Sequence, residues 1–267
     1  MADIRTRLRQ THDDIVPPPD VMGTLIGRRK RLERRKRDKR RKIVSLIVGV
    51  AVVAAGVGVV VHASGSPSTS GGPSGEPNPV ILSGARLSPG PHVLSIAGLQ
   101  ITIQVPEGWR GSDQGVVDSE FGADAPSGAG LEFWTVSNVY EDPCHWKSSA
   151  MQPPVGGSVN DLVRALVGQT GHPAGPRVKM GLRGFDTTKL EMQVPEDLDI
   201  SRCDNGEFHP WRSPQGDRYQ QGPGQVDQLF ITDVNGTRLV IDVSYFPGTS
   251  AKDREQVLEM FRSVEFG

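Results

Sequence analysis

Cysteine is scarce in this sequence of 267 residues, and the familiar catalytic signatures are missing. Only Cys144 and Cys203 are present, which is too few for a four-cysteine zinc site. The sequence has no G-x-S-x-G, no H-E-x-x-H, no G-x-x-x-x-G-K-[ST] and no G-x-G-x-x-G after a predicted strand. We therefore expect a protein that is not an enzyme, although its many carboxylates leave a glycosidase-type pair as an open alternative.

Charge is absent from residues 43–61, a run of 19 apolar and small residues. As a helix this run would extend roughly 28 Å at about 1.5 Å per residue, which matches a bilayer core of roughly 30 Å. A cleaved signal peptide is the alternative. However, its apolar region usually has about 7 to 15 residues, and its basic region is shorter than the 42 residues found here. The pattern favours an uncleaved signal anchor that spans the membrane once.

Positive charge is concentrated before the predicted span. Residues 1–42 contain 15 basic and 6 acidic side chains, whereas residues 43–267 contain 15 basic and 25 acidic ones. Twelve of the basic residues lie between Arg28 and Lys42. By the positive-inside rule, the N-terminus is predicted in the cytoplasm and the C-terminal domain outside the cell membrane.

The basic run from Arg28 to Lys42 has two interpretations. In a soluble protein such a run would indicate binding to nucleic acid. Here it is tethered to a predicted span, and each Lys or Arg near an anionic leaflet gains roughly 1 kcal/mol. We expect it to contact the anionic headgroups of the lipid bilayer, with no nucleic acid as partner.

The composition divides the chain into four parts. Residues after the span are rich in Pro, Gly and Ser, which is typical of a flexible linker. Every Trp, Tyr and Phe lies beyond that linker, in a stretch long enough for one folded domain. The predicted parts are a basic cytoplasmic segment (1–42), a transmembrane helix (43–61), a linker (62–79) and an extracytoplasmic domain (80–267).

Hydrophobic periodicity in the last part predicts an antiparallel sheet. Apolar and polar residues alternate from Leu99 to Val105, as in a strand with one wet face. Asn235-Gly236 between two apolar runs predicts a tight hairpin, because these residues favour the positive φ that such a turn requires. The other predicted strands are 131–140, 178–182 and 187–194, the last two forming a pair that turns at Gly184.

Two helices are predicted to flank this sheet. Ser158 with Asp161, and Ser250 with Asp253, have the spacing of helix N-terminal caps. Each precedes an apolar face at helical spacing. Strands in hairpins with two helices packed on them indicate an α+β fold.

The two cysteines lie in the part predicted outside the cell, where a disulfide between Cys144 and Cys203 is the default. A metal site is the alternative, because His145 and His209 lie near them in sequence. Their spacing matches no common zinc pattern. We expect the disulfide, no metal and no cofactor.

A Cys144–Cys203 bridge would bring residues 142–146 and 201–211 together. The surrounding segment, 195–225, is long and polar and is predicted as a loop. Its aromatic residues have two interpretations: they plug the core from above, or they form a ligand-binding face. The candidate stacking residues are Trp146, Trp211 and Tyr219.

Several segments together resemble a type of single-pass membrane protein from high-GC Gram-positive (actinobacterial) bacteria. They are the basic run, QVPEGW at 104–109, NVYEDPCHW at 138–146 and GQVDQLFITDVNGTRLVIDVSYFPGTS at 224–250. The resemblance implies a basic cytoplasmic stub, one span, and an extracytoplasmic α+β domain, but no activity. The order of strands and helices also resembles the sandwich of the PsbP and Mog1 group.

The expected function is a membrane-anchored module that binds an envelope ligand or a membrane partner outside the cell. The alternative is a transmembrane signalling regulator, similar to anti-sigma proteins, that acts through residues 1–42. That segment contains no cysteine, so it lacks the zinc motif of many such regulators.

Overall fold

The structure is a computed structural model that describes residues 79–118, 121 and 127–267. The predicted basic segment (1–42), the predicted span (43–61) and nearly all of the predicted linker (62–79) lie outside these residues. Among the residues described, no helix is both long enough and apolar enough to cross a bilayer. The fold below is that of the predicted domain, 80–267.

The centre of this domain is a seven-stranded antiparallel sheet, with strand order β3-β4-β5-β12-β11-β8-β7. Its middle strands are buried on both faces, which explains why their sequences are apolar runs rather than strict alternations. The strands are β3 (Arg110–Gly111), β4 (Gly115–Val117), β5 (Ala129–Trp134), β7 (Val178–Leu182), β8 (Phe185–Gln193), β11 (Val226–Val234) and β12 (Thr237–Tyr245).

The predicted Asn235-Gly236 hairpin is confirmed as the turn between β11 and β12. Val234 pairs with Thr237, so the loop has two residues. Asn235 and Gly236 have φ values of 53° and 87°, the positive φ pair of a primed turn. The predicted pair around Gly184 is confirmed as β7 and β8.

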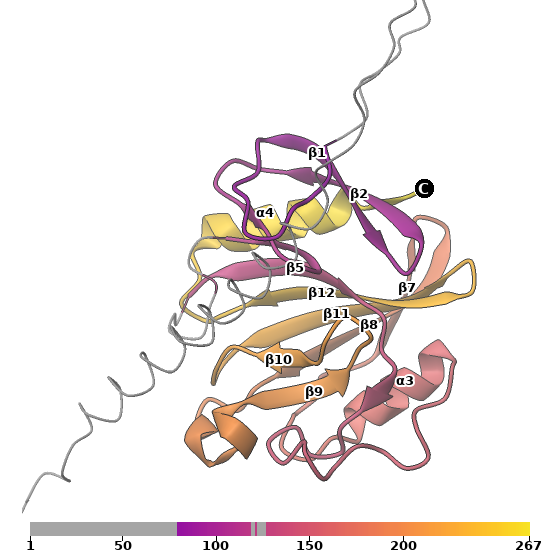
Figure 1. Cartoon of the computed structure of the whole chain (residues 1–267), viewed down its shortest axis with the longest axis vertical. Helices are drawn as coiled ribbons and strands as arrows, with labels where there is room; N and C mark the ends of the chain where they lie inside the picture. Colours follow the sequence, from indigo (N-terminus) through magenta and orange to yellow (C-terminus); the bar gives the residue numbers. More distant parts are fainter. Residues whose placement is uncertain (1–78, 119–120, 122–126) are drawn as a thin grey trace, which may run out of the picture. The chain divides into compact units, whose positions relative to one another are not determined.

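One face of the large sheet is covered by α4 (Ala251–Arg262) and a small sheet (Figure 1). That sheet has the order β1-β2-β13, with β1 at Gly90–Ile96, β2 at Leu99–Val105 and β13 at Glu265–Phe266. The alternating strand predicted at 99–105 is therefore confirmed. The core between these layers includes Ile101, Phe133, Ile241, Val257 and Phe261.

The opposite face is covered by α3 (Val159–Val167) and by a second small sheet of order β10-β9-β6 (Figure 1). Leu162, Leu190, Leu229 and Val240 form the core on this side. The strands of this sheet are β6 (Asn138–Val139), β9 (Phe208–Arg212) and β10 (Arg218–Gln220).

Both predicted helix caps are present. The Ser158 hydroxyl accepts from the Asp161 N–H, and the Asp161 carboxylate accepts from the Ser158 N–H, which completes a capping box. Ser250 accepts from the Asp253 N–H in the same way. The predicted α+β class is confirmed: an antiparallel sheet carries one helix on each face.

Two boundary predictions are wrong. The single strand predicted at 131–140 is two strands, because β5 ends at Trp134 and β6 belongs to a different sheet. The segment 195–225 is not a plain loop, since it contains two short 3-10 helices as well as β9 and β10. The helices are η1 (Ile200–Arg202) and η2 (Asp204–Gly206).

Candidate functional site

The predicted disulfide between Cys144 and Cys203 is present, with an S–S distance of 2.07 Å and Cα atoms 4.5 Å apart. Two backbone hydrogen bonds run beside it. The Asp204 N–H donates to the Cys144 carbonyl at 2.8 Å, and the His209 N–H donates to the Pro143 carbonyl at 2.9 Å. The two loops are thus joined by a covalent bond and by hydrogen bonds that would persist without it.

Four rings next to the disulfide form what we call the aromatic cluster: Tyr140, Trp146, His209 and Tyr219. The centroids of Trp146 and His209 are 4.4 Å apart. Tyr140 lies 6.1 Å from Trp146, and Tyr219 lies 5.9 Å from His209. Trp146 and Tyr219 are half-buried, whereas Tyr140 and His209 are buried. Two of the three predicted stacking residues therefore do meet, with His209 between them.

Trp211 is placed differently. It lies on β9 and is 0% exposed, and its ring meets Trp134 edge to face at 6.3 Å. Both indoles belong to the core beneath α3. Trp211 has no exposed ring face for a ligand, which matches the interpretation that aromatic residues of this segment plug the core.

Charged groups border the aromatic cluster. Arg212 lies over the Tyr140 ring at 5.5 Å and donates to its hydroxyl at 3.2 Å. That hydroxyl donates in turn to Asp217 at 2.6 Å. The Lys147 ammonium is 5.7 Å from the Trp146 ring. Half-buried aromatic rings with charged neighbours suit a ligand that combines polar groups with an apolar face.

A buried ion cluster lies on the α3 side of the large sheet. Arg218, on β10, is 2% exposed. Its guanidinium is 2.9 Å from Asp242, 3.1 Å from Asp227 and 3.6 Å from Glu132. One buried positive charge therefore faces three carboxyl groups. An excess of negative charge is unfavourable in a buried site, so carboxyl groups there retain protons.

Protonation of this cluster follows from burial. Burial raises the pKa of Asp242 well above its ordinary value, opposed by Arg218 and reinforced by Asp227. Burial also raises the pKa values of Asp227 and Glu132, again opposed by Arg218. The proximity of the two aspartates lowers the pKa of Asp227 and raises that of Asp242. Asp242 is therefore the carboxyl that keeps its proton to higher pH.

This carboxyl pair is sealed from solvent. Asp227 and Asp242 are both 0% exposed, and Gln220 and Gln225 donate to Asp227 at 2.7 and 2.8 Å. A substrate cannot reach either group without unfolding of the surrounding sheet. The cluster accordingly stabilises the packing of β10 on β5, β11 and β12 and is not arranged as a glycosidase-type pair.

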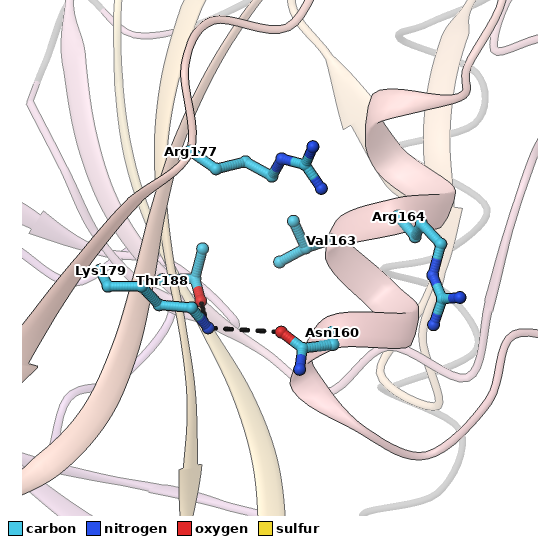
Figure 2. A pocket seen from close by; sticks show the side chains of 6 residues that line it. All are labelled: Asn160, Val163, Arg164, Arg177, Lys179 and Thr188. Carbon is cyan, nitrogen blue, oxygen red and sulfur yellow. Dashed lines mark hydrogen bonds between the residues drawn. The ribbon is translucent and has the colours of Figure 1, made fainter.

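A cleft opens between α3 and the strands β7 and β8 (Figure 2), with a volume of about 320 Å³. Lys179 donates to Thr188 at 2.8 Å and to Asn160 at 3.3 Å. Arg164 is instead paired with Asp161 at 2.7 Å. The cleft is lined by Asn160, Val163, Arg164, Arg177, Lys179 and Thr188.

The alternative metal site is wrong, because both sulfur atoms are in the disulfide. His145 binds Asp142 instead, with Nδ1 2.8 Å from Oδ2. In the part of the chain that the structure describes, no group of three or more His, Cys, Asp or Glu side chains could hold a metal ion.

The sequence did not predict the cleft, and it did not predict the buried ion cluster. The cleft residues come from two segments, 160–164 and 177–188, that meet only through the fold. The ion cluster had a local signal, namely a charged residue inside an apolar strand: Asp242 interrupts LVIDV, and Glu132 interrupts LEFW. Such a residue indicates a buried partner of opposite charge.

Comparisons with known proteins identify no family. No family model matches the chain, and no curated protein matches its sequence. Among solved structures, the chain is similar to the solution structure of cyanobacterial PsbP (CyanoP) from Synechocystis sp. PCC 6803. The match has 14% identity, covers 73% of this chain and all of that one, and has a TM-score of 0.34. A likeness at that level carries no argument about function.

Proposed function

We propose that the protein is a single-pass membrane protein whose C-terminal domain binds a ligand or partner on the outer side of the membrane, without catalysing a reaction. The observation that supports this most directly is the Cys144–Cys203 disulfide. Structural disulfides persist in oxidising compartments and are rare where thiols are kept reduced. The charge division of the sequence, with the basic run before the apolar one, points to the same orientation.

The binding role rests on the aromatic cluster. Trp146 lies in the segment that carries Cys144, whereas His209 and Tyr219 lie on β9 and β10. The disulfide and the backbone hydrogen bonds of Asp204 and His209 join the Cys144 segment to the segment that leads into β9. The Trp146 indole N–H is already bound to the Asp204 carbonyl at 3.1 Å, so the ring is oriented before any ligand arrives. A pre-oriented ring loses little conformational entropy on binding.

Thiol trapping combined with fractionation tests this proposal. Cells that express the full chain are quenched with acid, and free thiols are alkylated before and after reduction. We expect the protein in carbonate-washed membranes, with Cys144 and Cys203 alkylated only after reduction. Variant Cys144→Ser is the matched control, because its single remaining thiol should react without reductant. Protein found in the soluble cytosolic fraction with both thiols alkylated would refute the proposal.

A further inference from the structure

The cleft between α3 and the β7–β8 pair concentrates positive charge in an acidic part of the chain. Residues 43–267 carry 25 acidic and 15 basic side chains. Yet three of the six residues that line this cleft are Arg164, Arg177 and Lys179, and none of the six is acidic. A concave, positively charged surface raises the local concentration of anions.

Two of these cations have no counter-charge among the residues that the structure describes. There, Lys179 donates to the neutral oxygens of Thr188 and Asn160. Within the described residues, Arg177 and Lys179 form no ion pair. Arg164 differs, because Asp161 neutralises it at 2.7 Å. Figure 2 shows its guanidinium directed away from the other two.

Polar side chains accompany these charges on both walls. On the helix wall, the Oδ1 atom of Asn160 accepts from Lys179, which leaves its Nδ2 group to donate to a ligand. On the sheet wall, the buried Thr188 accepts from Lys179 and so holds the ammonium group at the cleft. Donors that approach from two walls suit a tetrahedral anion with several oxygens better than a flat carboxylate, and Arg binds phosphate oxygens through paired donors.

We propose that this cleft binds a phosphate group. Arg177 and Lys179 supply the charge, Asn160 adds a hydrogen bond, and the buried Thr188 positions Lys179. A phosphodiester polymer and a phospholipid headgroup both present this chemistry. The proposal does not depend on which side of the membrane the domain occupies.

The test needs a reporter inside the cleft, because the basic run from Arg28 to Lys42 also attracts phosphate. Val163 lines the cleft, so its methyl groups serve as that reporter in the ¹³C-methyl spectrum of the full chain in nanodiscs of uncharged lipid. We expect inorganic phosphate to shift the Val163 signal saturably. The signal of Val257, which is buried against the other face of the sheet, should stay unchanged.

Three substitutions distinguish a defined binding site from general attraction to positive surface charge. Arg177→Gln and Lys179→Gln should each weaken phosphate binding about tenfold, the loss expected for one charge-assisted hydrogen bond. Arg164→Gln is the matched control: it removes the same charge from the cleft wall, and we expect a change below about twofold. The three side chains are exposed, and thermal unfolding checks that each variant remains folded.

Two arms distinguish the source of phosphate. A Val163 shift in nanodiscs of phosphatidylglycerol indicates a lipid headgroup, and a shift with soluble glycerol-phosphate oligomers indicates a polymer; either result supports the proposal. A Val163 signal that does not respond to phosphate overturns it. So does an Arg164→Gln variant that binds as weakly as Arg177→Gln, because that result would indicate diffuse electrostatic attraction.

Discussion

A chain in which serine replaces both Cys144 and Cys203 is expected to unfold with a free energy about 4 kcal/mol below that of the parent. The bridge spans 59 positions, and opening a loop of that length restores conformational entropy to the unfolded chain. Urea denaturation at neutral pH, followed by tryptophan fluorescence, measures the difference. A loss of this size is a large fraction of the roughly 5 to 15 kcal/mol that stabilises a domain.

Reduction provides the control for this prediction. Dithiothreitol should lower the stability of the parent by the same amount and leave the double variant unchanged. The folded signal should persist in both cases, because Asp204 and His209 still bind the opposite loop through their backbone N–H groups. A difference below about 1 kcal/mol between parent and double variant would contradict the role assigned to the bridge.

Arg218→Gln is expected to cost about 3 to 5 kcal/mol at pH 7.5, the range for breaking a buried ion pair from one side. The substitution leaves Glu132, Asp227 and Asp242 facing one another without a counter-charge. The pKa values of these carboxyl groups should therefore rise, because only protonation relieves their mutual repulsion. The cost should therefore shrink at pH 5, where protonation is easier, and urea denaturation at the two pH values measures it.

Asp242 contributes the same linkage to the parent protein. The folded-state pKa of this carboxyl lies above its ordinary value of 3.8, so Asp242 keeps its proton to higher pH in the folded chain than in the unfolded one. Its contribution to stability is full below pH 3.8 and is lost as pH rises through the folded-state pKa. The substitution Asp242→Asn removes that titrating group and keeps the size and shape of the side chain.

This asparagine variant is the matched control for Arg218→Gln. Its amide, like a protonated carboxyl, carries a hydrogen that it can donate to a neighbouring carboxylate such as Asp227. We therefore expect its stability at pH 7.5 to equal or exceed that of the parent, and the difference between variant and parent to shift in favour of the variant from pH 5 to 7.5. An Arg218→Gln cost below about 1 kcal/mol, or a cost that is equal at both pH values, would disagree with a buried charge imbalance.

Local sequence patterns predicted the elements whose signals are local. The Asn235-Gly236 turn requires positive φ at two adjacent positions, and few other residue pairs adopt it readily. The caps at Ser158 and Ser250 depend on a hydroxyl and a carboxylate three residues apart. Such features are encoded within a few residues, and both were found.

Features that depend on distant segments were missed. Strand β9 reads FHPWR, in which Pro210 interrupts the strand pattern and no alternation is visible. It forms because it pairs with β6 and β10. Strand β6 lies far from it in the sequence, and both partners are too short to recognise from the sequence alone. The same reason applies to Trp211: the sequence left open whether it plugs the core or faces a ligand, and the fold places it in the core.

The candidate sites show the same difference between local sequence signals and contacts made by distant segments. Trp146 and Tyr219 were predicted because a disulfide could be inferred from compartment and cysteine count, and His209 lies between them. Lys179 lies on the edge strand β7 and Arg177 directly precedes that strand, with α3 across the cleft from both. Their spacing from Asn160 in the sequence does not indicate that these residues line the same cleft.

Side-specific labelling tests the central claim most directly, namely that one membrane crossing separates the basic segment from the folded domain. A cysteine is introduced singly at Ser95, which is exposed on β1, or at Thr6 in the basic segment. Spheroplasts are then treated with a membrane-impermeant maleimide before and after lysis. We predict that Ser95→Cys reacts in sealed spheroplasts and that Thr6→Cys reacts only after lysis. Protection of Ser95→Cys until lysis would contradict the account.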